Sequence, residues 1–217
     1  MSATSPARIG GYVLAGGKSS RMGTEKALLE LGGRPLIAHA VAKLQDICAQ
    51  VSVLSGNPDL AAYGPLVPDL HPGCGPISGI EAALAHSRFE WNLLVPVDVP
   101  FLPAAFLSDW VQHVVAKQDF RAAIFEAGGR PQPGVLLIHG SAKPHISAAI
   151  ERGEYKLLPA LQAAAHSSLL HIERLDAASA SWFTNVNTPE ELEGARRLVL
   201  ETGEPPAQNE TGSGDAS

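Results

Sequence analysis

Cysteine is scarce in this chain, and long hydrophobic runs are missing altogether. The 217 residues include two cysteines, Cys48 and Cys74, which are too few for a disulfide framework and lack the clustered spacing of a zinc site. No apolar run approaches the length of about 20 residues that crosses a bilayer, and residues 1–8 lack the apolar core of a signal peptide. The sequence therefore predicts a cytoplasmic protein without a membrane partner.

An excess of basic residues is also missing. The formal net charge is −6, whereas a protein that coats nucleic acid needs a basic surface to neutralise phosphates. The charge is compatible with one phosphorylated ligand held by a few local cations. Hydrophobic residues make up 45% of the chain, which is enough for the core of a single α/β domain.

Short apolar runs alternate with segments whose apolar residues recur at helical spacing. This alternation predicts a mostly parallel sheet covered by helices on both faces. Residues 1–8 are expected to be flexible, residues 9–202 to form the domain, and residues 203–217 to be disordered because they have little to bury. Strands are expected at 9–15, 51–54, 66–67, 91–97, 122–125, 135–138 and 169–172. Helices are expected at 35–48, 79–86, 103–116, 142–152, 157–165 and from Thr188 onward, with a loop at 127–134.

The first predicted strand runs into a glycine-rich segment that carries several cations. It reads Leu14-Ala15-Gly16-Gly17-Lys18-Ser19-Ser20-Arg21-Met22-Gly23-Thr24-Glu25-Lys26. Two adjacent glycines alone are typical of a tight turn, but they also let backbone N–H groups approach phosphate oxygens. Arg21 can fork onto two of those oxygens, and Lys26 can add a point charge. The segment matches neither the P-loop nor the Gly-x-Gly-x-x-Gly dinucleotide motif, and we interpret it as a different phosphate-binding loop.

Carboxylates and amides follow other predicted strands. Asp98 comes directly after the most apolar run, at the sheet edge where α/β proteins bind ligands. Carboxylates there can hold Mg²⁺, which takes its other ligands from water and substrate phosphates, although Asp98 could instead order a turn. Asp69 is a candidate for the nucleotide base or ribose, with turn formation as its alternative. Asn185 and Asn187 could face a metal or a substrate phosphate, or serve the backbone before a helix.

Other catalytic arrangements find no support in the sequence. The eight histidines are scattered without a metal-binding pair, and there is no Gly-x-Ser-x-Gly elbow for a serine nucleophile. A reaction without a protein nucleophile is the simpler hypothesis, with an acceptor phosphate oxygen attacking the α-phosphorus of a nucleoside triphosphate. Positioning and charge stabilisation then dominate catalysis.

Several segments together resemble the signature of the molybdenum cofactor guanylyltransferases. They occur in the family's order between about residue 9 and residue 200, and the first is the most specific. The segments are Leu14–Gly23 with Lys26, Leu28–Leu36, Asp69, Gly75-Pro76-Ile77-Ser78-Gly79, Pro96-Val97-Asp98-Val99-Pro100 and Asn185-Val186-Asn187-Thr188-Pro189-Glu190-Glu191-Leu192.

This resemblance implies a three-layer α/β/α fold of the nucleotide-diphospho-sugar-transferase type, which is Rossmann-like. It implies transfer of GMP from GTP to the terminal phosphate of molybdopterin or its molybdenum form, with Mg²⁺ as cofactor and release of pyrophosphate. It also implies transient contacts with other proteins of molybdenum cofactor biosynthesis or with molybdoenzymes.

The resemblance also assigns site residues by position. Arg21, Lys26 and Asp98 would be catalytic, with Asp98 as the metal ligand, and Asn185 or Asn187 would lie on the acceptor side. The implied nucleotide-binding residues are Leu14, Ala15, Gly16, Gly17, Lys26, Asp69 and Asp98.

The chain departs from the family at a few positions. Leu54 stands where members often have Asn, and Asn57 or a backbone group is its expected replacement. Val97 replaces a frequent Cys, Gln132 stands where His-Pro is expected, and Tyr155-Lys156 replaces an Arg pair. Most of these changes fall on the acceptor half.

The alternatives are therefore a relative that uses CTP or another phosphorylated acceptor, and a non-catalytic nucleotide- or pterin-binding chaperone. The pair Gly16-Gly17 favours guanine, since cytidylyl relatives tend to have Ala-Ala-Gly there. Lys26 and Asp98 favour an enzyme, and the missing dinucleotide motif disfavours an oxidoreductase.

Overall fold

The computed structural model describes residues 8–16, 25–117, 119–164 and 170–202. The two predicted flexible ends, 1–8 and 203–217, lie outside these ranges apart from Arg8. Gly17 and Arg21, two of the predicted site residues, also lie outside the described residues.

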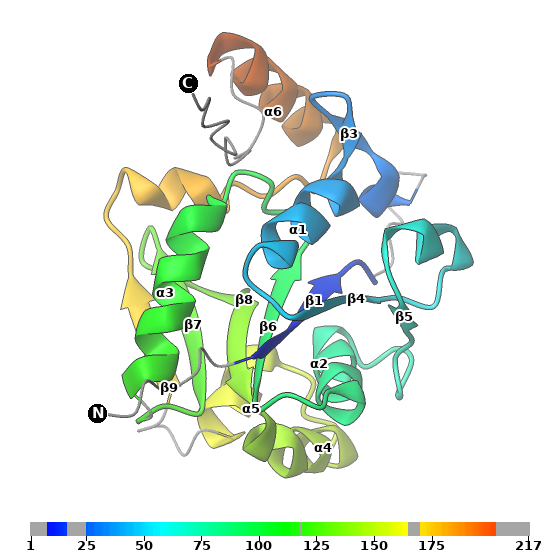
Figure 1. Cartoon of the computed structure of the whole chain (residues 1–217), viewed down its shortest axis with the longest axis vertical. Coiled ribbons are helices and arrows are strands. Elements are labelled where there is room, and N and C mark those ends of the chain that lie inside the picture. The colour runs from blue at the N-terminus through cyan, green and yellow to red at the C-terminus, as the bar shows by residue number, and fades with distance from the viewer. Residues whose placement is uncertain (1–7, 17–24, 118, 165–169, 203–217) are drawn as a thin grey trace, which may run out of the picture.

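A seven-stranded sheet forms the centre of the described molecule (Figure 1). Its strands occur in the order β5-β4-β1-β6-β8-β7-β9, and the described part contains one further small sheet of two strands, β2 and β3. The strands are β1 (Ile9–Leu14), β2 (Glu30–Leu31), β3 (Arg34–Pro35), β4 (Gln50–Leu54), β5 (Leu66–Val67), β6 (Trp91–Pro96), β7 (Ala122–Ala127), β8 (Arg130–His139) and β9 (Leu170–Arg174).

All strands of the large sheet run in the same direction except β8. The strand β8 pairs antiparallel with both β6 and β7, while β7 and β9 are parallel. The predicted mostly parallel sheet is confirmed. As a result, the first residues of β8 lie at the edge where β1, β4 and β6 end.

Helices cover both faces of the sheet, which confirms the α/β fold with three layers. One buried cluster joins the sheet to α1, α3 and α6, and a second joins it to α2, α4 and α5. Alternate strand residues enter different clusters, as with Val13 and Tyr12 of β1. The helices are α1 (Leu36–Gln45), α2 (Pro76–His86), α3 (Ala104–Lys117), α4 (Lys143–Glu151), α5 (Leu157–Ala164) and α6 (Pro189–Thr202).

The predicted loop at 127–134 is wrong, because this segment is a β-hairpin. Gly128 and Gly129 form the whole turn between β7 and β8, with φ angles of 57° and 71°, the positive values that a tight two-residue hairpin turn requires. Pro131 and Pro133 lie in the first half of β8. They are tolerated because β6 pairs with β8 only between Trp91↔His139 and Leu94↔Leu136, so this part of β8 has passed beyond the end of β6.

Other short elements were not predicted. A hairpin of β2 and β3 turns at Gly32 and Gly33, both with positive φ. The helix α2 begins at Pro76 rather than at residue 79, because Gly75 with φ 74° ends the preceding loop and proline suits the first helical turn. Short 3₁₀ helices occupy Lys26–Leu28, Pro58–Tyr63, Gly140–Ala142 and Ser179–Phe183.

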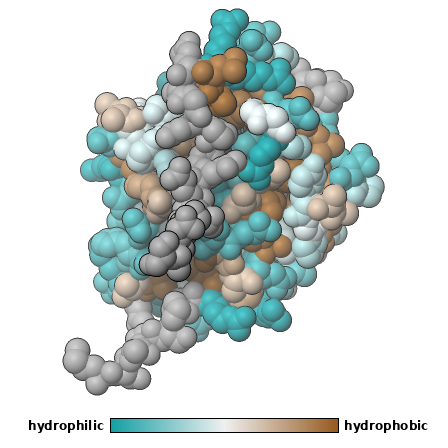
Figure 2. All heavy atoms as spheres, turned by 45° about the horizontal axis from the view of Figure 1, so that its top comes forward, coloured by the Kyte–Doolittle hydropathy of each residue, from teal (hydrophilic) through white to brown (hydrophobic). Residues whose placement is uncertain are grey.

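The surface carries few large hydrophobic groups. In the described part they are Leu70, Tyr155, Leu198 and Leu200, and Figure 2 shows brown residues scattered among teal ones on its visible face. Among the described helices, none is both long and apolar enough to cross a membrane.

Candidate active site

Three predicted site residues from distant parts of the sequence meet through the Lys26 side chain. Its Nζ donates to Asp98 Oδ2 at 3.1 Å and to Asn187 Oδ1 at 2.6 Å. The Lys26 and Asp98 side chains are 16% and 26% exposed, so the ion pair is shielded from solvent but still accessible. The sequence separations of 72 and 161 residues mean that only the fold brings these groups together.

The position of Asp98 follows from the residues on either side of it. Val97 and Val99 are buried in the cluster beneath α1 and α3, so the side chain between them is directed away from that cluster. The backbone N–H of Val97 donates to Leu14 O at 3.2 Å, continuing the pairing of β6 with β1. The Asp98 carbonyl accepts from Val186 N at 3.0 Å, which fastens the segment before α6 to the end of β6.

A capping box orders the chain around Asn187. Glu191 Oε2 accepts from the backbone N–H groups of Asn187 (2.6 Å) and Thr188 (3.1 Å), and Thr188 Oγ1 accepts from Glu191 N at 3.2 Å. This reciprocal arrangement satisfies the free N–H groups of a helix start. The predicted helix start at Thr188, with Pro189 as its first helical residue, is confirmed. Glu191 thereby holds the backbone of Asn187, whose side chain accepts from Lys26.

The three residues line a cavity of about 800 Å³ at the ligand edge of the sheet. This volume lies within the usual range for small-molecule sites. Further predicted residues on its wall are Leu14, Ala15, Gly16 and Asn185. Val97 and Gln132, two of the departures from the family, also lie on this wall. The remaining wall residues were not predicted as site residues: Pro76, Pro96, Val99, Pro133, Gly134, Val135, Leu157, Phe183, Thr188 and Glu191.

The described part of the glycine loop lies close to the end of β4. Ala15 N donates to Leu54 O at 3.4 Å, and a Cβ placed on Gly16 would lie 3.3 Å from the same oxygen. Glycine therefore permits this close approach. The Leu54 side chain is buried, so Leu54 presents its carbonyl, and not a side-chain amide, at this edge.

Asn57, the expected replacement for the family's Asn at 54, is occupied elsewhere. Its Nδ2 donates to Glu25 Oε2 at 3.1 Å, and its Oδ1 accepts from Asp59 N at 3.0 Å. Asn57 does not line the cavity. Its contact with Glu25 steadies the residue next to Lys26, so its effect on the site is indirect.

Asp69 lies at the same edge but is not part of the cavity wall. It follows β5, and its carboxylate packs near α2, since a Cβ on Gly79 would lie 3.6 Å from Asp69 Oδ1. Although the residue as a whole is exposed, partial desolvation of the carboxyl raises its pKa above the usual value. The Leu14 and Leu54 side chains lie against the same glycine, at 3.4 Å and 3.7 Å from such a Cβ.

The wall opposite the glycine loop comes from the beginning of β8. Between the pairs Ile124↔Leu136 and Phe125↔Gln132 the register with β7 shifts, so residues 133–135 bulge from the ladder. Pro133, Gly134 and Val135 thereby reach the cavity. The sequence predicted site residues after the carboxyl ends of parallel strands. This wall was not predicted because it is formed by the amino end of an antiparallel strand.

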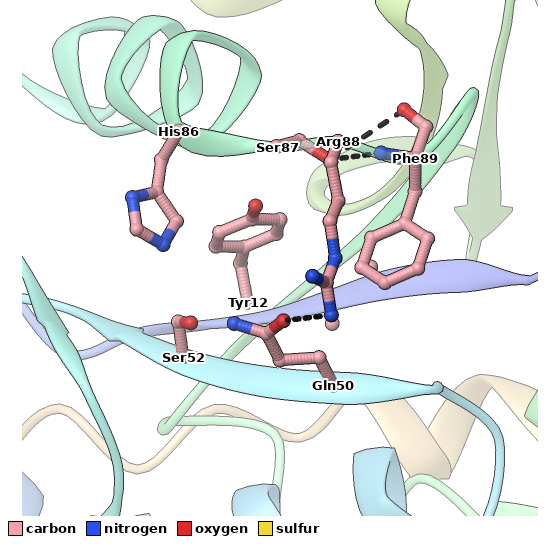
Figure 3. A pocket seen from close by; sticks show the side chains of 9 residues that line it. Tyr12, Gln50, Ser52, His86, Ser87, Arg88 and Phe89 are labelled. Atoms are coloured by element: carbon pink, nitrogen blue, oxygen red, sulfur yellow. Dashed lines mark hydrogen bonds between the residues drawn. The ribbon is translucent and has the colours of Figure 1, made fainter.

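A second, smaller cavity of about 240 Å³ lies between the first residues of β1 and β4 and the end of α2 (Figure 3). Two of its polar side chains pair with each other. Arg88 donates to Gln50 Oε1 at 3.3 Å, and its guanidinium lies 5.4 Å from the centre of the Phe89 ring. No carboxylate lines it, so the larger cavity is the better candidate for chemistry on phosphates.

The donor set around Lys26 fits a hard cation and does not fit a transition metal. Among the described residues, no group of three or more His, Cys, Asp or Glu side chains could enclose a metal. Asp98 Oδ2 and Asn187 Oδ1 offer one carboxylate and one amide oxygen around a position now bridged by a cationic ammonium. Such a sparse oxygen set matches Mg²⁺, which usually keeps waters and substrate phosphates as ligands.

Comparison with known proteins agrees with this geometry. Residues 11–167 match the MobA-like NTP transferase domain family. Two molybdenum cofactor guanylyltransferases are each 36% identical to the chain: that of Serratia proteamaculans over 84% of this chain and 91% of its own length, and that of Xanthomonas euvesicatoria over 83% and 90%.

A solved structure, molybdopterin-guanine dinucleotide biosynthesis protein A from Archaeoglobus fulgidus, is 25% identical. It superposes with a TM-score of 0.72 over 88% of this chain and 99% of that one. The family match spans most of the sheet and the predicted phosphate loop, and the two relatives extend it over most of the chain. The chain therefore belongs to the MobA-like NTP transferase domain family.

Proposed function

We propose that this protein is a Mg²⁺-dependent molybdenum cofactor guanylyltransferase. It would transfer GMP from GTP to the terminal phosphate of molybdopterin, or of its molybdenum form, with release of pyrophosphate. The observation that carries the proposal is the Lys26–Asp98–Asn187 contact beside the glycine loop in the large cavity. The names of the two 36% identical relatives support guanine as the base and the molybdenum cofactor as the acceptor.

The cavity has two sides that suit two phosphorylated substrates. Leu14, Ala15 and Gly16 offer backbone groups on one side, and we assign this side to GTP. Asp69 would accept hydrogen bonds from the nucleoside. Gln132, Asn185 and the bulge of β8 form the other side, which we assign to the acceptor.

In the reaction, an acceptor phosphate oxygen attacks the α-phosphorus of GTP, and the bond from that phosphorus to the bridging oxygen of pyrophosphate breaks. The attacking oxygen is already ionised near neutral pH, so the site needs no strong base. Lys26 would move its hydrogen bonds from Asp98 and Asn187 to the phosphates, and Asp98 would hold Mg²⁺. When bound, Mg²⁺ supplies charge that polarises the phosphates and stabilises the leaving group.

Arg21 and Gly17 keep their predicted roles at the triphosphate as part of this proposal. The cytoplasmic location, the lack of nucleic-acid and membrane partners, and the contacts with other cofactor-biosynthesis proteins or molybdoenzymes remain predictions.

The direct test mixes the protein with molybdopterin or its molybdenum form, Mg²⁺ and each nucleoside triphosphate in turn, and identifies the product by mass spectrometry. We expect a guanylyl adduct and one pyrophosphate per turnover. A cytidylyl adduct would reassign the nucleotide. Tight binding of GTP and acceptor without any adduct would instead support the binding-chaperone alternative.

A further inference from the structure

A lysine side chain lies buried directly behind the turn that presents Asp98. Lys43 of α1 is 3% exposed. Its Nζ donates to Val99 O at 3.1 Å and also to Pro100 O. These are the two carbonyls that follow Asp98 in the chain. Within the described part of the chain, Lys43 forms no ion pair with a carboxylate.

Burying a lysine costs free energy because its charged form loses hydration. An ordinary core position of α1 would be filled by an apolar residue, as Leu36, Ile37 and Leu44 fill theirs. The position of Lys43 therefore calls for an explanation beyond filling space. The two carbonyls are the groups that compensate for its burial.

The turn has few backbone N–H groups to offer these carbonyls. Pro96 and Pro100 have none to offer, and the described backbone partner of Val99 O is Leu102 N, at 3.4 Å. Lys43 belongs to α1, and its hydrogen bonds connect both carbonyls of the turn to that helix. An uncharged amine still has two N–H groups, so this attachment does not depend on the protonation of Lys43.

We infer that Lys43 is a positioning residue for the active site: it holds the Val99–Pro100 turn so that Asp98 presents its carboxylate to the cavity. The turn is held from three directions. Lys43 binds it from the core, Val186 N binds Asp98 O from the segment before α6, and Val97 N binds Leu14 O in β1. Lys43 contacts no cavity-lining side chain through these bonds, and it acts through the backbone.

This inference rests on the proposed role of Asp98 in binding Mg²⁺ with GTP. The test substitutes Lys43→Met, which keeps the length and burial of the side chain but removes its donors. Calorimetric titration measures the affinity for GTP with and without Mg²⁺, and product formation gives kcat and the KM for GTP. We expect the gain in GTP affinity from Mg²⁺ to fall roughly tenfold and kcat to fall by a similar factor, while Mg²⁺-free GTP binding stays unchanged.

A matched control separates positioning from loss of stability. Val114→Ala removes buried volume from α3. Val114 lies ten residues, or roughly 15 Å along the helix, beyond Ala104, the first residue of α3 after the Asp98 turn. This variant should lower the Tm and leave kcat and the Mg²⁺ effect unchanged. Should Lys43→Met fail to fold, Lys43→Gln replaces it; this shorter side chain keeps donors but cannot span both carbonyls, and we expect an intermediate loss.

If either folded Lys43 variant kept the wild-type kcat and the wild-type Mg²⁺ effect on GTP affinity, the inference would be overturned. A lower Tm with both quantities unchanged would overturn it equally, because Lys43 would then serve stability alone. A wild-type protein that shows no Mg²⁺-dependent binding of GTP would contradict the proposed function instead, so the two failures are distinguishable.

Discussion

The Lys26 ammonium bridges Asp98 and Asn187, and this contact joins the chain after the glycine loop to the end of β6 and to the start of α6. A lysine that donates to both oxygens stands in for a cation between them. When Mg²⁺ and a triphosphate enter, the same lysine has phosphate oxygens as new acceptors.

Removing either charge should slow the reaction strongly. We expect Lys26→Ala and Asp98→Asn each to lower kcat by roughly 10²–10³-fold, because a preorganised electrostatic contact in a shielded site is worth about 3–4 kcal/mol in the transition state. Lys117→Ala, at the exposed end of α3, is the control for loss of a lysine. Steady-state release of pyrophosphate measures the effect, and wild-type rates in both site variants would refute the assignment.

The capping box of α6 should matter for both stability and activity. Glu191→Ala leaves the N–H groups of Asn187 and Thr188 without their acceptor. We expect the free energy of unfolding to fall by about 1 kcal/mol and kcat to fall several-fold, since Asn187 loses its fixed position. Glu191→Gln retains an acceptor oxygen and should lie close to wild type in urea unfolding and in rate. Equal losses in the two variants would point to charge rather than capping.

The free energy of unfolding should rise with pH because of the lowered pKa of Lys43. Burial lowers the pKa of Lys43 from 10.5 to about 7 in the folded protein. Below pH 7 both folded and unfolded chains carry the proton, and the cost of burying the charge is present in full. Between about pH 7 and 10.5 the unfolded chain binds a proton that the folded chain does not, so unfolding becomes less favourable as pH rises.

Relative to Lys43→Met, the wild-type free energy of unfolding should therefore increase by at most about 1.4 kcal/mol per pH unit over this window. Urea unfolding of both proteins at pH 6, 7.5 and 9 measures the difference. Parallel pH dependences for the two proteins would show that Lys43 keeps its ordinary pKa.

The thiol of Cys48 should resist alkylation in the folded state. Burial raises its pKa to about 12, which suppresses the reactive thiolate. The sulfur also packs against β1, where a Cβ on Gly11 would lie 2.9 Å from it. We expect iodoacetamide at pH 8 to leave Cys48 unmodified until urea unfolds the protein, as read by peptide mass spectrometry. Fast modification in native buffer would contradict this packing.

The sequence predicted most of the fold because strong local patterns agree with the tertiary structure. The run before Asp98 is apolar except for Asn92, and β6 is buried on both faces. Thr188-Pro189-Glu190-Glu191 carries a complete helix-start signal, and α6 begins there. The hairpin at Gly128-Gly129 was not predicted. Its second strand contains two prolines, which are tolerated only because β6 ends before it reaches them, and the sequence does not show where a neighbouring strand ends.

Some residues of the candidate site were predicted from the sequence and others were not. Lys26, Asp98, Asn185 and Asn187 were found because they lie in segments with recognisable motifs, and all four line the cavity. The wall from β8 depends on strand direction and on a register shift, neither of which leaves a local signal. The role of Lys43 was not predicted either, because a lysine in a helical pattern is usually exposed. Its two carbonyl partners are 56 and 57 positions away in the sequence, so no local pattern points to them.

In the proposed assignment, the reversed direction of β8 would let the acceptor side of the cavity change separately from the nucleotide side. The side assigned to GTP is built from the end of β1 and the residues after it, and the chain continues through the β2–β3 hairpin into α1. The side assigned to the acceptor includes the start of β8, which follows a two-glycine turn that a substitution or insertion can reshape without moving a helix. Selection on acceptor chemistry would then concentrate its changes between Gly128 and Val135.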